Sequence, residues 1–448
     1  MFQADKLLFA CMTCDNLIEK IIAGNITEIC FKGEILVNKK TRKLSRFLIL
    51  TIMLLTAIIF PQFSAAGQNL VAKEVIEINT KADLIALLNR VHPSSSGVPG
   101  DQKRYGIIDS TINLNADIEI SSDDINSQIP ENTLYTKYEH AFKMENSSFL
   151  GNGHTITITQ GTRRIYPLFG ELRVSGADTG FVAQVERLSL VYKGNVYGSG
   201  FARMITQAWF GNTNHRIQQI NITVEGSILP ISEKFWTQNL NSENTQAKAA
   251  GFAEYVDGAE IKDVNITVAG DIGTLTPEKQ EHAQTELIYG RSSGFILARN
   301  SRASNAALQP IDNLNISVAG SILGGSKHFK AEALGLGYDL QEKKFTNVTL
   351  NVVKDIKVVA DGDSLFTTPY SYLHDPHIAS AVGHDLHHIE NSTIHIGGDI
   401  SAANNSNVGM KTNATGIGDW DYLNDLTDPV LQQNPLTINN LTLTVGGS

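Results

Sequence analysis

Half of the histidines in this sequence lie close together, which raises the possibility of a metal site. Six of the twelve fall between positions 374 and 395, with Asp375 and Asp385 among them. Neutral imidazole and carboxylate groups are ligands that Zn²⁺ and similar ions accept. If this segment folds as adjacent strands, His384, His387 and His395 are the three that converge. The spacing fits no established ligand motif, so the alternative is a polar surface patch, and we predict no resident metal or other cofactor.

A glycosidase would hold two catalytic carboxylates about 5 to 9.5 Å apart. The adjacent pair Asp123-Asp124 lies in a polar stretch, before the repeats described below. The sequence contains no His-Gly pair and no Arg-Ile-Lys, which a polygalacturonase-like enzyme would show. We therefore predict no catalytic residues and expect that the chain is not an enzyme.

Composition sets the broad class of protein. With 448 residues, 42% hydrophobic and 18% charged, the chain is able to bury a large core. Its formal net charge of −10 argues against a nucleic-acid partner, which requires a basic face.

The segment 39–66 has the three parts of a secretory signal peptide. Lysines and arginines at 39–46 precede the apolar run 47–60, and the small residues 64–66 follow it. The apolar run is shorter than the roughly 20 residues of a membrane span. We therefore predict cleavage after Ala66 and an exported, cell-surface protein.

Residues 1–38 precede this predicted signal, and two interpretations of them stay open. Either translation begins near Val37 and residues 1–36 are not made, or the signal is extended. The three cysteines of the sequence all lie in this segment, so the chain from Gly67 onward is cysteine-free. They are Cys11, Cys14 and Cys30.

One strand-like pattern recurs along the chain. In its clearest copy, at 261–272, apolar Val264, Ile266 and Val268 alternate with polar Asn265 and Thr267. Alternation with period two is typical of a strand that has one buried face. The other copies lie at 185–196, 217–228, 311–322, 345–356, 388–400 and 438–448. Their predicted inward residues include Ile220, Ile222 and Val224; Leu314, Ile316 and Val318; Val348, Leu350 and Val352; and Leu441, Leu443 and Val445.

Glycines recur at two positions of the repeat. A glycine follows most of the strands, and we expect it to permit a corner with positive φ. These glycines are Gly226, Gly270, Gly320, Gly398 and Gly446. A second element of the form small-Gly-apolar precedes the strands, at 179–181, 199–201, 250–252, 293–295, 334–337, 381–384 and 415–418.

Strands of constant register joined by connections of unequal length predict a stacked solenoid. The alternative is a sandwich or a series of small β-domains, which would need hairpin turns that this sequence rarely offers. We assign an N-terminal cap and first strands to 67–145 and the β-helix repeats to 146–448. A short amphipathic helix at 80–90 is expected to cap the first coil, with Leu84, Leu87 and Leu88 on one face.

Four segments in front of the repeats resemble the head of bacterial surface proteins with GLUG-type repeats. They are INTKADL at 78–84, INLNADIEI at 112–120, FLGNGHTITI at 149–158 and PLFG at 167–170. The likeness extends over about 75–448. It implies an all-β fold, a right-handed parallel β-helix, of the kind found in adhesins and autotransporter passengers.

The function expected from these features is that of an adhesin or structural stalk. Its loops would contact glycans or proteins on host or neighbouring cells, and an anchor or translocator domain is expected beyond residue 448. The alternative is a polysaccharide-binding or polysaccharide-degrading β-helix. Loop aromatics that would favour glycan binding are Trp209, Phe210, Trp236 and Trp420. The repeat places an outward Asn and an outward Ser or Thr on either side of an inward apolar residue, so it produces Asn-x-Ser/Thr sequences at positions such as Asn221, Asn265 and Asn315. The alternative is that these sequences are glycosylation sites of a glycoprotein.

Overall fold

The computed structural model describes most of the chain beyond residue 73. The described residues are 74–88, 90, 107–125, 142–174, 183–207, 215–237, 242–278, 288–298, 308–338, 340, 343–361, 377–386, 388–405, 412–417 and 437–447. All belong to one compact unit, Lys73–Ser448. The predicted signal peptide at 39–66 and the segment 1–38 lie outside them. So do Trp209, Phe210 and Trp420.

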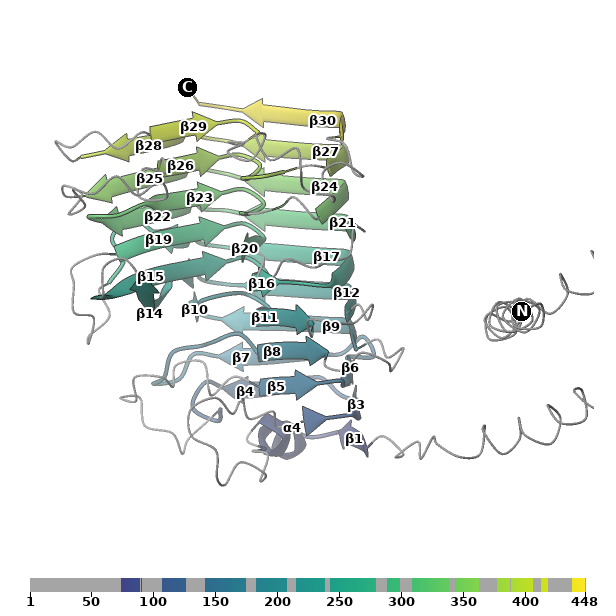
Figure 1. The fold of residues 1–448 in the computed structure, drawn as a ribbon. Helices are drawn as coiled ribbons and strands as arrows, with labels where there is room; N and C mark the ends of the chain where they lie inside the picture. Colours follow the sequence, from purple (N-terminus) through teal and green to yellow (C-terminus); the bar gives the residue numbers. More distant parts are fainter. Residues whose placement is uncertain are drawn as a thin grey trace, which may run out of the picture. The chain divides into compact units, whose positions relative to one another are not determined.

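This unit is a parallel β-solenoid, as the repeat predicts, and its coils form three sheets (Figure 1). The long sheet contains the recurring strand of every coil. Its stacked strands are β1 (Glu74–Ile78), β3 (Ser110–Leu114), β6 (Ser148–Leu150), β9 (Gln184–Lys193), β12 (His215–Val224), β17 (Ala259–Val268), β21 (Gln309–Val318), β24 (Lys343–Val352), β27 (His388–Ile396) and β30 (Thr437–Val445). Beside the first of them lie β4 (Ile118–Ser121) and β7 (Thr155–Thr159).

The other two sheets complete each coil. The six-stranded sheet consists of β2 (Ile107–Ile108), β5 (Phe142–Glu145), β8 (Phe169–Val174), β11 (Ala202–Gln207), β16 (Ala253–Val256) and β20 (Ile296–Ala298). The third sheet has two arms. The first arm stacks β10 (Val196–Tyr197), β13 (Ile228–Leu229), β18 (Ile272–Thr274), β22 (Ile322–Lys327), β25 (Ile356–Asp361) and β28 (Ile400–Asn404). The second arm stacks β15 (Ser242–Ala250), β19 (Ile288–Ser293), β23 (Ala331–Leu334), β26 (His377–Ser380) and β29 (Thr412–Thr415).

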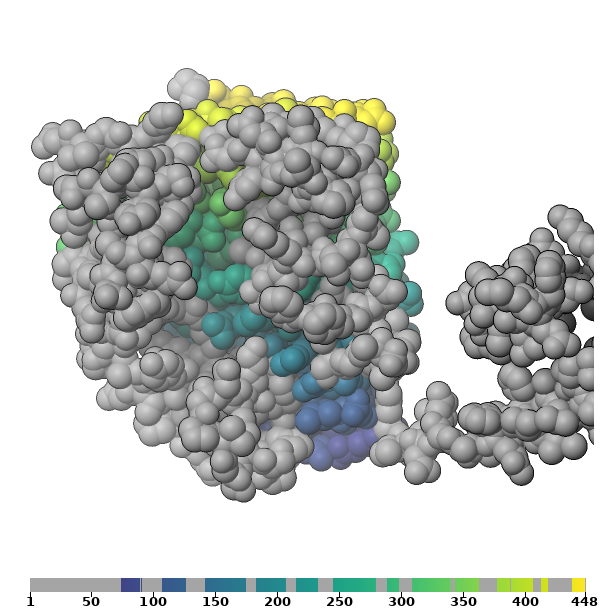
Figure 2. Space-filling model, viewed as in Figure 1, coloured from purple at the N-terminus to yellow at the C-terminus, as the bar shows by residue number. Residues whose placement is uncertain are grey.

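Nearly all pairings between the described strands are parallel. The exceptions are the hairpin of β14 (Ile231–Thr237) with β15 and a single antiparallel contact between Ile288 and Lys327. Parallel neighbours cannot be joined by a tight hairpin and need a longer crossover. The pairing therefore excludes the series of small hairpin-built domains. In the space-filling view the coloured residues follow one another in sequence order from the N-terminal to the C-terminal coils (Figure 2).

The apolar positions of the repeat stack into one core. Ile222 pairs with Ile266, Ile266 with Ile316, and Ile316 with Leu350, all at most 2% exposed. Each such side chain contributes about 1.5–3 kcal/mol when it leaves water, so the register is fixed by burial. On β30 the predicted inward residues Leu441 and Leu443 are only half-buried, since no described strand stacks on their far side.

The glycines after the long-sheet strands differ from our expectation, because none of the five has positive φ. They lie close to the backbone of an adjacent coil instead. The Gly320 amide donates to the Gly270 carbonyl at 3.1 Å, and a Cβ on Gly320 would lie 2.6 Å from that oxygen. Lys354 occupies the same place in the next coil, where its amide stands 3.2 Å from the Gly320 carbonyl.

Positive φ also occurs within the long-sheet strands. In each of the seven strands from β9 to β30 one residue at the same height has φ between 49° and 56°, and its neighbours pair while it is skipped. These residues are Arg187, Gln219, Asp263, Asn313, Asn347, Asn391 and Asn440. Asn and Asp tolerate this left-handed conformation better than most residues. Each strand is therefore kinked at one fixed position.

The small-Gly-Phe elements build an aromatic stack inside the solenoid. The Phe201 and Phe252 rings lie 4.7 Å apart and nearly parallel, and Phe252 and Phe295 lie 5.0 Å apart. A Cβ on Gly251 would lie 2.8 Å from the carbonyl carbon of Gly294, so glycine lets adjacent coils approach closely enough for the rings to stack.

The predicted N-terminal helix is present as α4 (Lys81–Leu88), the single helix among the described residues. Its buried side chains are Leu84, Leu87 and Leu88, and it packs against β4 and β1 at the first coils (Figure 1). Asp83 caps it by accepting the Thr80 amide at 2.9 Å. No helix within the described part of the chain is long and apolar enough to span a membrane.

Candidate functional site

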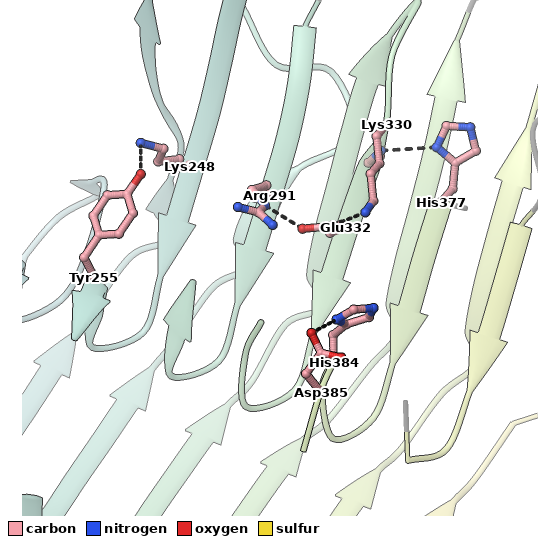
Figure 3. A network of polar contacts seen from close by, with 9 residues as sticks. Lys248, Tyr255, Arg291, Lys330, Glu332, His377, His384 and Asp385 are labelled. Atoms are coloured by element: carbon pink, nitrogen blue, oxygen red, sulfur yellow. Dashed lines mark hydrogen bonds and ion pairs between the residues drawn. The ribbon is translucent and has the colours of Figure 1, made fainter. Parts of the chain in front are cut away.

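The strongest concentration of buried charge lies on the second arm of the third sheet (Figure 3). Lys248, Arg291 and Glu332 occupy the same register position on β15, β19 and β23. The next residues on two of these strands, Ala249 and Ala333, belong to the core. Since side chains alternate across a strand, the charged residues point away from that core. Their side chains are nevertheless buried, with 5%, 11% and 1% exposed.

Glu332 joins two cations. Its Oε2 lies 2.5 Å from Arg291 Nε, and its Oε1 lies 2.8 Å from Lys330 Nζ. Burial alone raises the pKa of Glu332, but the charges of Arg291 and Lys330 outweigh it and hold the pKa well below its ordinary value. Glu332 is therefore a permanent anion, and the three residues form one ionic unit with a net positive charge.

Tyrosine rings enclose the Arg291 guanidinium. Its Cζ lies 4.2 Å from the ring centre of Tyr338 and 4.8 Å from that of Tyr289. Such cation–π contacts strengthen when they are removed from water. Burial and the charge of Glu332 raise the pKa of Tyr338 to about 12, so its phenol stays neutral. On the preceding coil another buried cation contacts a tyrosine, because Lys248 Nζ donates to the Tyr255 hydroxyl at 2.8 Å.

His384 continues this stack at the corner after β26. Its ring lies 4.6 Å from that of Tyr338 and is nearly parallel to it, and its Nδ1 is 2.8 Å from Asp385 Oδ2. Burial lowers the pKa of His384, but the hydrogen bond and charge of Asp385 outweigh it and raise the pKa above its ordinary value. The other nitrogen, Nε2, is buried and has no hydrogen-bond partner among the described residues.

His377 is the second buried imidazole of the network. Its Nδ1 accepts the Ala331 amide at 3.2 Å, and its Nε2 has no hydrogen-bond partner within the part of the chain that the structure describes. Burial and the nearby Lys330 charge lower its pKa to about 4. His377 is therefore neutral at physiological pH, whereas His384 is biased toward the charged form.

The structure describes two of the three histidines predicted to converge. His384 is buried in the corner after β26, and His395 is exposed on the outward face of β27. His387 lies outside the described residues. Within the described ranges no group of three His, Cys, Asp or Glu side chains is arranged to hold a metal ion.

The adjacent carboxylates considered for catalysis stabilise turns. Asp124 pairs with Lys81 at 2.7 Å, and Asp123 accepts the backbone amides of Thr162 and Arg163. These hydrogen bonds lower the pKa of both carboxyls. Both are therefore ionised, and their oxygens already bind Lys81 or backbone amides.

The outward face of the long sheet carries ladders of polar side chains. Asn265 Nδ2 donates to Asn221 Oδ1 at 2.9 Å, and Asn315 Nδ2 donates to Asn265 Oδ1 at 3.1 Å. At the kinked positions Asn313 donates to Asp263 at 2.6 Å and Asn440 donates to Asn391 at 3.0 Å. The amide groups that sequence alone marked as possible glycosylation sites thus bind one another from coil to coil.

Another ladder runs along the corner after the long sheet. From the coil of β9 onward, a short polar side chain of one coil accepts the backbone amide of the next in five successive steps, at 2.7 to 3.3 Å. Its members are Asn195, Ser227, Asp271, Ser321, Asp355 and Asp399. The serine or aspartate that follows Gly226, Gly270, Gly320 and Gly398 is therefore structural.

Compared with family models, with curated proteins and with solved structures, the chain matches none.

Sequence reasoning did not find the charged network, although it carries a signal. Lys248, Arg291 and Glu332 each stand three residues before the glycine of a small-Gly-apolar element. Aligning the elements on that glycine places the three residues in one column. The remaining members, such as Lys330 and Tyr338, have no repeating counterpart.

Replacing Glu332 by glutamine is expected to destabilise the protein by about 3–5 kcal/mol, because it leaves Arg291 and Lys330 buried without their anion. The matched control is Glu119→Gln, which removes the exposed pair with Lys193 and should cost at most about 1 kcal/mol. Thermal unfolding of both variants checks this. Equal losses of stability would contradict the account.

Stability should fall on acidification partly through His377. Its folded pKa of about 4 lies below the ordinary value near 6.5, so between these values the unfolded chain binds the extra proton. The stabilisation that comes from burying neutral His377 is present above about pH 6.5 and is lost as the pH falls toward 4. Between pH 7 and pH 5 the free energy of unfolding should therefore fall by roughly 2 kcal/mol less in His377→Gln than in the parent, as denaturant unfolding at the two pH values would show. The exposed His395→Gln serves as control and should follow the parent.

Proposed function

We propose that the chain is an exported β-solenoid displayed at the cell surface, where it acts as an adhesin or structural stalk. The observation that carries this proposal is the in-register stack itself. Ile222, Ile266, Ile316 and Leu350 continue one apolar column from coil to coil without a break. Because every coil is packed on its neighbours, the unit is suited to act as a stalk that displays a contact surface at a distance from the cell.

The polar ladders support a role in contact rather than in catalysis. Asn221, Asn265 and Asn315 present neutral amides that already satisfy part of their hydrogen bonding along the column. The connections between the strands differ in length along the sequence, and we assign to them the contacts with glycans or proteins of host or neighbouring cells. Such variable loops on a rigid scaffold are a common arrangement for binding.

Export is supported by the sequence features of 39–66 and by the lack of cysteine after residue 30. A long solenoid core makes disulfides unnecessary for stability outside the cell. We place an anchor or translocator beyond residue 448 in this scheme.

One specific observation favours the second candidate, a polysaccharide-binding or polysaccharide-degrading protein. Arg291 and Lys330 supply cations, and the His384–Asp385 pair leaves one imidazole nitrogen unpartnered. Cations beside an acid–base pair suit the recognition of acidic sugars and proton transfer to or from them. The described residues bury all of these groups, which is why we place this function second.

The test is to label intact and permeabilised producing cells with an antibody against the chain, and to delete its gene. We expect labelling of intact cells, loss of labelling when 39–66 is removed, and weaker attachment of the deletion strain to host or neighbouring cells. Labelling only after permeabilisation, or unchanged attachment, would contradict the proposal.

The second candidate is distinguished with the purified chain. Incubation with neutral and acidic polysaccharides should release no new reducing ends. Release that disappears in His384→Ala and persists in the exposed control His395→Ala would replace the first proposal by the second.

A further inference from the structure

Two buried polar side chains face each other across adjacent coils at the start of the long-sheet strands. Gln309 is the first residue of β21 and Lys343 is the first residue of β24, and the two are register partners. Lys343 is 1% exposed and Gln309 is 9% exposed. They lie 34 residues apart in the chain, so only the stacking of coils brings them together.

The Lys343 amine is held against the Gln309 amide. Its Nζ donates to the Val256 carbonyl at 3.0 Å and also to Gln309 Oε1. Nothing in the repeat calls for a lysine here. The positions that stack below it in the preceding coils are Ala259 and His215, neither of which carries a long cation.

Reaction between the two groups requires a base that takes a proton from the amine. The neutral amine is the nucleophilic form of lysine, and a carboxylate placed beside the group is able to accept its proton. The electrophile is the amide carbon of Gln309, which carries the Oε1 atom that Lys343 contacts.

We propose that Lys343 and Gln309 are joined by an intramolecular isopeptide bond. Lys343 Nζ bonds to Gln309 Cδ, and the Cδ–Nε2 bond of Gln309 breaks. One proton passes from Nζ to the departing nitrogen, which leaves as ammonia. No oxidant, reductant or further reactant is needed, and the product is a secondary amide across two coils.

The proton carrier that we assign is Asp257. It follows Val256 directly, and it is 2% exposed. Its charge acts on the neighbouring His215, which places the carboxylate in this same corner. The carboxylate takes the proton from the attacking amine and returns it to the leaving nitrogen, so it is unchanged at the end.

Such a bond would tie the coil of β21 to the coil of β24. A covalent link between distant residues stabilises a fold mainly by restricting the unfolded chain. This inference is independent of the proposed surface function, because it concerns the covalent structure of the solenoid alone.

Intact-mass spectrometry of the full chain tests the proposal. We expect the mass to be lower than that of the sequence by one ammonia, and digestion to give a branched peptide that joins Lys343 to Gln309. Lys343→Met should have its full sequence mass and a lower unfolding temperature. Lys344→Met is the matched control, because Lys344 is the exposed neighbour and its loss should leave the ammonia deficit in place.

A parent chain of full sequence mass would overturn the proposal, as would an ammonia deficit that maps to other residues. In Asp257→Asn the full mass is expected. A branched peptide that still forms in that variant would overturn the role given to Asp257.

Discussion

The structure depends on one constraint, that each coil must repeat the backbone of the coil before it at the spacing of hydrogen-bonded strands, about 4.7–4.9 Å. At that spacing Ile266 lies directly between Ile222 and Ile316, and Phe252 lies between Phe201 and Phe295. The same constraint decides where side chains are forbidden. Gly251 is a glycine because a Cβ would meet the backbone of Gly294 in the adjacent coil.

Polar groups obey this constraint as strictly as apolar ones. An asparagine repeated at one height binds its own copy in the next coil, so a ladder satisfies itself along the column. Where the repeat changes residue, the stack brings unlike groups together. Arg291 and Glu332 meet in this way on the second arm, and so do Gln309 and Lys343 on the long sheet. The chemically distinctive places of the protein are therefore the departures from its own repeat.

The sequence allowed the strands, the inward residues and the capping helix to be predicted, because period-two alternation and glycine spacing report directly on burial. It misled about the corner glycines, since a glycine needed for close approach looks the same in sequence as one needed for positive φ. The kink at residues such as Asn313 was hidden because its residue type varies between coils. The charged network was missed because connections of unequal length separate Lys248, Arg291 and Glu332, and only an alignment on the glycines places them in register. The histidines could not be placed from the sequence either. His384 and His395 are close in the chain, but His384 is buried in a corner and His395 faces water.

The central claim is that successive coils stack in register along one axis, and distances between spin labels test it most directly. Cysteines placed at Asn221 and, in turn, at Thr349, Thr393 or Thr442 would carry the labels, with Cys11, Cys14 and Cys30 replaced by serine. These positions follow one another in register on the outward face of the long sheet. The account predicts backbone separations of roughly 14, 19 and 24 Å, one strand spacing for each coil. Separations that do not increase in equal steps would contradict it.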